Sequence, residues 1–115
     1  SSVEVMHGVL QLNKGESLAL GPGASATVTM RVVGRNTKGP IATAVVPLEG
    51  ASFPLDFSIV RSDMRDVPDF LWREEDLYVK ADVATNSGAV MAVGRSKAKF
   101  KDGVHGTAYV TLERV

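Results

Sequence analysis

The chain has 115 residues, of which 44% are hydrophobic and 23% charged, so it is long enough to bury one core and too apolar for a disordered segment. Its 13 basic and 13 acidic residues cancel, which argues against nucleic acid or an anionic membrane as the partner, because these attract a basic excess. Cysteine is absent, which excludes disulfides and thiolate metal sites, and no run of about 18 apolar residues marks a membrane span. We expect a single domain over residues 1–115.

Turn-forming clusters divide the chain into short segments. Glycine supplies the positive φ that tight turns need, and Asn and Asp tolerate it. The clusters lie at 13–15, 21–23, 34–39, 50–52, 86–88 and 102–103. They leave segments of about 6 to 12 residues, a spacing typical of a β-sandwich or a β-barrel.

Seven segments have the periodicity or composition of β-strands. In the clearest, Leu77 and Val79 face one way while Tyr78 and Lys80 face the other, as in a strand with one buried face. The expected strands are 3–12, 26–33, 41–46, 55–59, 77–85, 89–100 and 108–113. The turn at 86–88 predicts a hairpin between the fifth and the sixth.

One stretch, 61–75 (RSDMRDVPDFLWREE), has no strand pattern and carries the only tryptophan. A short helical turn or a structured loop can begin near Pro68, because proline is tolerated in a first helical turn. Such an irregular excursion from a compact domain is usually either functional or a flap over the core.

Metal chemistry has little support in the sequence. His7 and His105, with Met6 or Met91, could in principle offer a soft copper site. The histidines do not form a pair with ligand spacing, and no carboxylate triad accompanies them. We therefore expect ordinary surface or turn histidines and no cofactor.

Catalysis also lacks a signature. No serine lies in a nucleophile-elbow pattern, and the acidic residues between 63 and 76 belong to a solvated loop in which no carboxylate pair can be argued. The Gly-Pro-Gly at 21–23 is too short for a phosphate-binding loop. The expected class is a non-enzymatic binding module, with an enzyme or a small-ligand carrier as the remaining alternative.

A row of basic residues is the first candidate binding surface. Arg95, Lys97, Lys99 and Lys101 occupy alternate positions, so on one strand they would share a face. Together with the acidic stretch 63–76, they give a neutral molecule segregated patches that suit docking on a complementary protein. The alternative is an edge strand that lysines protect against aggregation, and the two interpretations are compatible.

The apolar residues of the excursion are the second candidate. Met64, Phe70, Leu71 and Trp72 are of types that adapt to partners or form interface hot spots. Alternatively, Phe70, Leu71 and Trp72 fold back to plug one end of the domain. Trp72 fits this alternative better, whereas Met64 is the better candidate for exposure.

Short motifs in strand-like segments resemble the C-terminal β-domain of the CcmI/CycH-type cytochrome c biogenesis proteins. The first motif is Val5, Gly8 and Leu10, and the second is 39–42 together with 46–48. The third is 53–57 followed by Asp63 and Met64. The fourth is the alternating set Leu77, Val79, Ala81 and Val83, followed by Gly88. Together they span most of residues 3–95. The resemblance implies an extracytoplasmic-type antiparallel β-sandwich that docks on proteins of an electron-transfer pathway, and it carries over no active-site residues.

We expect a departure from that family, because these 115 residues show no pattern of a membrane anchor or of a helical-repeat domain, and the stretch from Arg95 to Val115 has no counterpart. The resemblance therefore implies an accessory or assembly subunit of a larger membrane-associated electron-transfer complex, photosynthetic or respiratory. Its setting would be peripheral to an energy-transducing membrane, in a periplasm or an organelle. The alternative is a cytochrome c maturation factor that transiently binds an apoprotein client.

Overall fold

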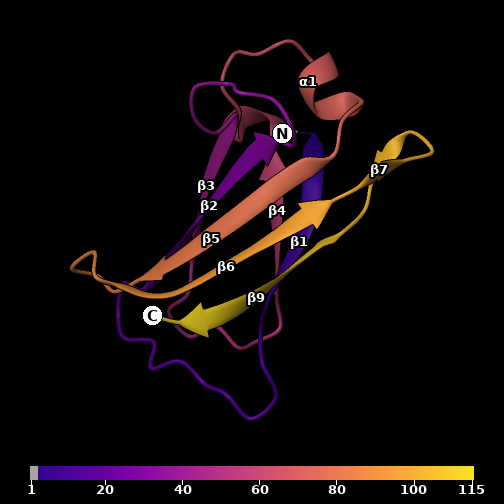
Figure 1. The fold of residues 1–115 in the computed structure, drawn as a ribbon. Coiled ribbons are helices and arrows are strands. Elements are labelled where there is room, and N and C mark those ends of the chain that lie inside the picture. The colour runs from indigo at the N-terminus through magenta and orange to yellow at the C-terminus, as the bar shows by residue number, and fades with distance from the viewer. Residues whose placement is uncertain (1–2) are drawn as a thin grey trace.

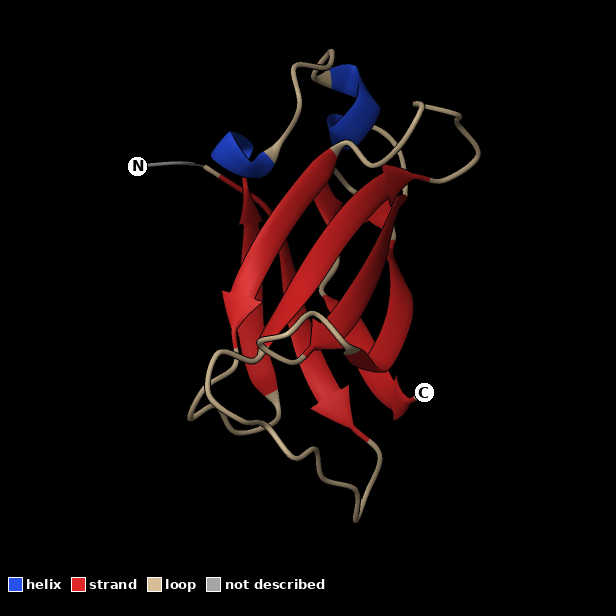
Figure 2. Ribbon diagram, turned by 90° about the vertical axis from the view of Figure 1, so that its left-hand side faces the viewer, coloured by secondary structure: helices blue, strands red, loops and turns tan. Residues whose placement is uncertain are grey.

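The computed structural model describes residues 3–115, and this part of the chain consists of strands, loops and two short helical turns. The elements are β1 (Glu4–Leu12), β2 (Ser25–Val32), β3 (Ala42–Pro47), β4 (Leu55–Val60), η1 (Arg61–Asp63), α1 (Phe70–Arg73), β5 (Leu77–Ala84), β6 (Val90–Ala98), β7 (Phe100–Lys101), β8 (Val104–His105) and β9 (Ala108–Arg114). The all-β fold class expected from the sequence is confirmed (Figure 2).

Seven strands form one sheet in the order β3-β2-β5-β6-β9-β1-β4 (Figure 1). Neighbouring strands are antiparallel except β1 and β9, which run parallel from the pair Gly8–Ala108 onward. β9 pairs with β1 as far as Leu112 and with β6 at Glu113 and Arg114. The sheet therefore differs from the expected antiparallel sandwich, because β9 joins the two halves into one mixed sheet.

This sheet curls into a nearly closed barrel. Its two edge strands approach at one end, where Ala42 of β3 forms an isolated bridge with Met64, just after β4. The backbone N–H of Arg65 donates to the carbonyl of Ile41 at 2.8 Å, and its guanidinium donates to the carbonyl of Thr37 at 2.7 Å. These contacts tie η1 and the following loop to β3 and hold the barrel together at this end.

The inner face of the barrel is one hydrophobic core, and the alternating segments face it as expected. Along β5, for example, Leu77, Val79, Ala81 and Val83 are all fully buried. No polar or charged residue among those described is buried, so the interior has no polar group around which a ligand site could be built. A binding site in this part of the chain has to lie on the surface.

Two glycines permit close packing that a side chain would prevent. A Cβ at Gly8 of β1 would lie 2.2 Å from Cζ of Phe57, its partner on β4, so the phenylalanine ring occupies the space above the glycine. A Cβ at Gly94 of β6 would lie 2.5 Å from the carbonyl oxygen of Thr111. At Gly94 the backbone of β9 passes directly against β6.

The hairpin expected between the fifth and sixth strands is present, as β5 and β6 with a turn closed by the Thr85 N–H bonding to the Ala89 carbonyl. However, β6 ends at Ala98 and not at position 100, because the N–H of Phe100 donates to the Asp76 carboxylate at 2.7 Å. A separate two-stranded hairpin, β7–β8, follows and turns through Asp102 and Gly103, both with positive φ. It projects from the side of the barrel (Figure 1).

The excursion at 61–75 contains the two helical turns, η1 and α1, which lie at the same end of the barrel (Figure 2). α1 begins at Phe70, two residues after Pro68, and is a single turn held by the N–H of Arg73 bonding to the Asp69 carbonyl at 3.1 Å. The short helical excursion is thus present where the sequence predicted it. Within residues 3–115, no helix has the length and apolar character needed to cross a membrane.

Candidate functional site

The outer surface of β2, β5 and β6 gathers basic side chains into one patch. The strand register places Arg31, Tyr78 and Lys97 side by side in one row across the three strands. The next row contains Lys80 directly opposite Arg95. We call this surface, made of Arg31, Lys80, Arg95 and Lys97 around Tyr78, the basic face.

Alternation along each strand is what turns these side chains outward. Met30, Val79 and Ala98 are buried in the core, so side chains of the opposite parity on the same strands point to solvent. Adjacent strands are about 4.8 Å apart, and residues i and i+2 on one strand are about 7 Å apart. The four cations are thus neighbours on a rigid surface.

Two of the cations on the basic face have a local interaction partner. The guanidinium carbon of Arg95 lies 6.0 Å from the centroid of the Tyr78 ring, within the range of a cation–π contact. The ammonium of Lys80 lies 3.8 Å from the Asp82 carboxylate on the same strand. Even so, two like charges face each other across the ladder, an arrangement that destabilises a sheet. Among residues 3–115, Asp82 supplies the one carboxylate that forms an ion pair with a cation of the basic face.

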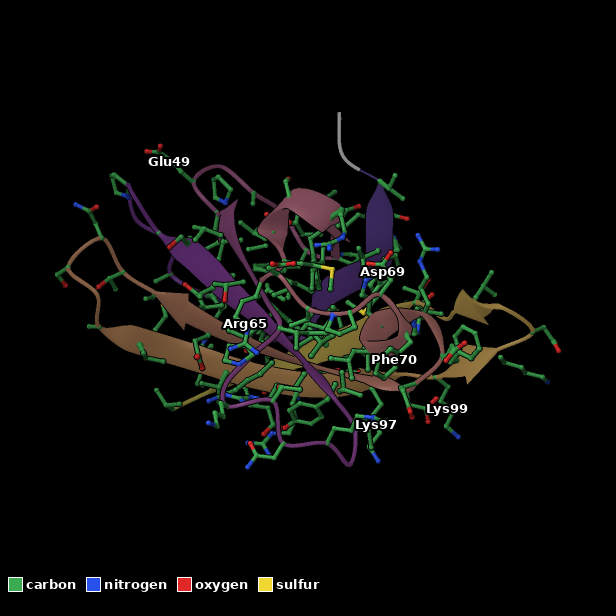
Figure 3. The ribbon with its side chains drawn as sticks, turned by 90° about the horizontal axis from the view of Figure 1, so that it is seen from above. Glu49, Arg65, Asp69, Phe70, Lys97 and Lys99 are labelled. Atoms are coloured by element: carbon green, nitrogen blue, oxygen red, sulfur yellow. The ribbon has the colours of Figure 1, made fainter. Side chains whose placement is uncertain are left out.

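The four basic residues predicted from their alternation do not all share this face. Arg95 and Lys97 lie on β6, but the strand ends before Lys99, and Lys101 belongs to β7. All four are exposed, and Figure 3 shows Lys97 and Lys99 leaving the same side of the molecule, opposite Glu49. The bend after Ala98 carries Lys101 onto the projecting hairpin and away from the sheet.

The topology limits the edge-strand interpretation of these basic residues. β6 pairs with β5 over its whole length but with β9 only at Ala92 and Val93. It is therefore not an outer strand of the sheet, while its second half, which carries Arg95 and Lys97, has a paired strand on one side. Arg31 and Lys80 were missed as site residues, because their place beside β6 depends on the pairing of β2 with β5. The alternation of 26–33 and 77–83 did indicate that both side chains point outward.

Trp72 is a core residue, which corrects its assignment as a partner-binding residue. Its side chain is 7% exposed, its Nε1–H donates to the Asp69 carboxylate at 3.3 Å, and the Arg73 guanidinium lies 4.7 Å from the ring centroid. Its carbonyl accepts a hydrogen bond from His105. The tryptophan plugs the end of the barrel, as the alternative interpretation expected.

The other apolar residues of the excursion divide in the same way. Met64, expected to be exposed, is half-buried against the core because its backbone bridges to β3, and Leu71 also packs on the core. Phe70 is 48% exposed, and the Arg35 guanidinium lies 5.7 Å from its ring centroid. Of the four predicted loop residues, Phe70 alone exposes a large apolar surface (Figure 3).

Two surface grooves are also present. One, of about 490 Å³, lies at the end of the barrel opposite the helical turns and is lined by apolar residues that include Leu12, Leu18 and Phe53. The second, of about 670 Å³, lies between the first half of β1, the end of α1 and the β7–β8 hairpin. His7 and His105 both line this second groove.

The histidines do not converge on a common centre. His7 Nε2 is 2.9 Å from the Asp56 carboxylate and its Nδ1 is 3.8 Å from Glu4, whereas His105 bonds to the Trp72 carbonyl. In the part of the chain that the structure describes, no group of three such side chains is arranged to hold a metal ion. The Ser58 hydroxyl donates to Glu4 and not to His7, so Ser58, His7 and Asp56 are not arranged as a nucleophile, base and acid.

Comparisons with known proteins give a likeness of fold. No protein-family model and no curated protein matches the chain. Among solved structures, an alternative pilotin from the type II secretion system of Vibrio cholerae aligns with a TM-score of 0.59 over 96% of each chain, at 16% sequence identity. At that identity the likeness concerns the fold alone.

Proposed function

We propose that this chain is a non-catalytic protein-binding module, an accessory or assembly subunit that docks on a larger assembly through its basic face. The observation that supports this most is the position of Lys80 directly opposite Arg95 in the middle of the sheet. Like charges so placed cost a sheet up to about 1 kcal/mol, and the carboxylates of a partner would relieve that repulsion on docking.

The partner that suits this surface is an acidic patch on another protein. The cations project from a sheet whose strands are fixed by their ladders, so little conformational entropy is lost when they are engaged. The chain as a whole carries no net charge, so the attraction is local to the basic face. Exposed Lys99 and Phe70 extend from the same side of the molecule (Figure 3) and would enlarge the contact.

The setting we propose is a membrane-associated electron-transfer complex, photosynthetic or respiratory. It is supported by the resemblance to the CcmI/CycH-type β-domain. The pilotin with the similar fold comes from a type II secretion system and does not bear on this setting. A cytochrome c maturation factor is the second candidate, favoured by the groove beside β1, where a client segment could bind.

The test is to produce the tagged chain in its own cells, release its assemblies gently, and follow its migration by size-exclusion chromatography at low and high salt. We expect the wild-type chain to migrate with a larger assembly at low salt and to dissociate as salt screens the charges. The double variant Arg95→Glu/Lys97→Glu should bind at least about tenfold more weakly and migrate as the free chain.

The matched control is Lys14→Glu/Lys38→Glu, which makes the same change of net charge at two exposed lysines away from the basic face. It should stay with the assembly. The control should unfold within about 0.5 kcal/mol of the wild type, because both of its side chains are exposed. The Arg95→Glu/Lys97→Glu chain should be no less stable than the wild type, and more stable by up to about 1 kcal/mol, because Arg95→Glu removes the like-charge pair with Lys80. A wild-type chain found only as a free monomer would contradict the proposal, as would an Arg95→Glu/Lys97→Glu chain that remains with the assembly.

A further inference from the structure

The hydrogen-bonded ladder between β1 and β9 does not include the N-terminal residues of β1. Pairing of the two strands begins at Gly8 and Ala108, whereas β1 itself begins at Glu4. On its other side, β1 is paired with β4 from Glu4 onward, with a bulge between Glu4 and Met6. Residues 4–7 thus have a neighbouring strand on one side and face the 670 Å³ groove on the other.

The opposite wall of this groove is the β7–β8 hairpin. β8 pairs with β7 through Val104–Lys101 and His105–Phe100. Beyond β8 the chain turns back toward the barrel at Gly106, whose N–H bonds to the Lys99 carbonyl at 3.0 Å, and enters β9. β1 and the segment before β9 therefore diverge, and the groove lies where a continued ladder would have been.

His105 carries a buried acceptor without a partner. Its Nε2 donates to the Trp72 carbonyl, and the Phe100 ring packs edge-on against the imidazole with centroids 5.2 Å apart, so the ring is fixed. In the neutral tautomer that this bond selects, Nδ1 is a hydrogen-bond acceptor. Nδ1 is buried and has no hydrogen-bond partner among the described residues. Because Nδ1 is buried, it is not open to the groove, and His105 contributes to the groove by fixing the β7–β8 hairpin against the end of α1.

We infer that this groove binds an extended polypeptide segment, which adds a strand beside residues 4–7 of β1. The walls combine a strand edge with apolar side chains from Val5, Met6, Phe100 and Val104, the combination by which an added strand is recognised. The groove is open along the surface, which suits a chain passing through it better than an enclosed small molecule.

This site is separate from the basic face, and its test does not depend on docking there. The probe is a library of random 12-residue peptides displayed on phage and selected on the whole chain. Selected peptides are then synthesised, and binding is followed by fluorescence anisotropy and by the amide shifts of residues 4–7 and 104–105. We expect Val104→Glu, in the groove wall, to weaken binding about tenfold or more.

The matched control is Val45→Glu on β3, because Val45 and Val104 are both 65% exposed and Val45 lies outside the groove. It should bind the peptides as the wild type does. N-methylation of one of the two alternating sets of peptide amides should also abolish binding, and N-methylation of the other set should not, since strand pairing with β1 uses every second N–H. The inference is overturned if no peptide is enriched, if binding is indifferent to Val104→Glu or to N-methylation, or if the shifts fall on Arg95 and Lys97.

Discussion

Replacing Gly94 by alanine tests the crossing of β6 and β9 that holds the basic face in place. The new methyl carbon would start 2.5 Å from the Thr111 carbonyl oxygen and 2.8 Å from Cγ1 of Val110, whereas comfortable contacts are about 3.5–4 Å. One of these neighbours is backbone, so the strands themselves must separate by about 1 Å. Overpacking of this kind costs about 1–3 kcal/mol, and the lower entropy of the unfolded alanine chain returns less than about 1 kcal/mol.

We therefore expect Gly94→Ala to lower the free energy of unfolding by about 2 kcal/mol, measured by urea denaturation with the slope unchanged. Gly21→Ala is the control, because no atom lies within 4 Å of its added Cβ and its φ is not in the left-handed region. It should be neutral or slightly stabilising. A Gly94→Ala chain as stable as the wild type, or a Gly21→Ala chain equally weakened, would refute the reasoning.

Two further substitutions probe the packing at other points. Gly8→Ala should cost about 1–3 kcal/mol by urea denaturation because its Cβ meets the Phe57 ring, and adding Phe57→Leu should recover part of that loss, since the obstacle is a side chain. Equal losses in the single and the double variant would show that the ring is not the cause. Trp72→Ala should cost about 3–5 kcal/mol and change the near-ultraviolet circular dichroism, because the indole is buried at the end of the barrel. Unchanged stability would instead mark Trp72 as a surface residue.

The strands themselves could be predicted because alternation is a local property of the sequence. The alternation from Leu77 to Val83 predicts which face is buried without information from any other segment. In the same way, the turn residues at 86–88 predict the hairpin. The joining of the two halves of the sheet depends on the parallel pairing of β1 with β9, which brings together residues as far apart as Gln11 and Thr111, 100 positions along the chain. No local sequence pattern predicts the pairing of β1 with β9. The periodicity of the strands therefore could not distinguish a sandwich from a barrel.

The candidate site was predicted in part for the same reason. Arg95 and Lys97 stand out because they alternate within one strand. Arg31 and Lys80 lie beside them because of the register in which β2, β5 and β6 pair. That register is a property of the tertiary structure, which the local sequence pattern does not predict. β6 ends where it does because Asp76, 24 positions away in the sequence, accepts a hydrogen bond from the Phe100 N–H. The alternation of basic residues carries no information about that contact, so it could not predict that Lys99 and Lys101 lie outside the sheet.

The parallel pair of β1 and β9 also sets the order in which the chain can fold. β1 ends at Leu12 and its neighbour β9 begins only at Ala108, so that pairing waits until every other strand of the sheet has emerged. The β5–β6 hairpin can form sooner, because its strands are adjacent in sequence. Until β9 arrives, the edge of β1 that faces away from β4 and the side of Gly94 that faces β9 stay uncovered, and such unpaired strand edges favour aggregation. A ribosome-bound chain shortened before Ala108 should therefore remain open to proteases and chaperones, and the last strand should bring the barrel together.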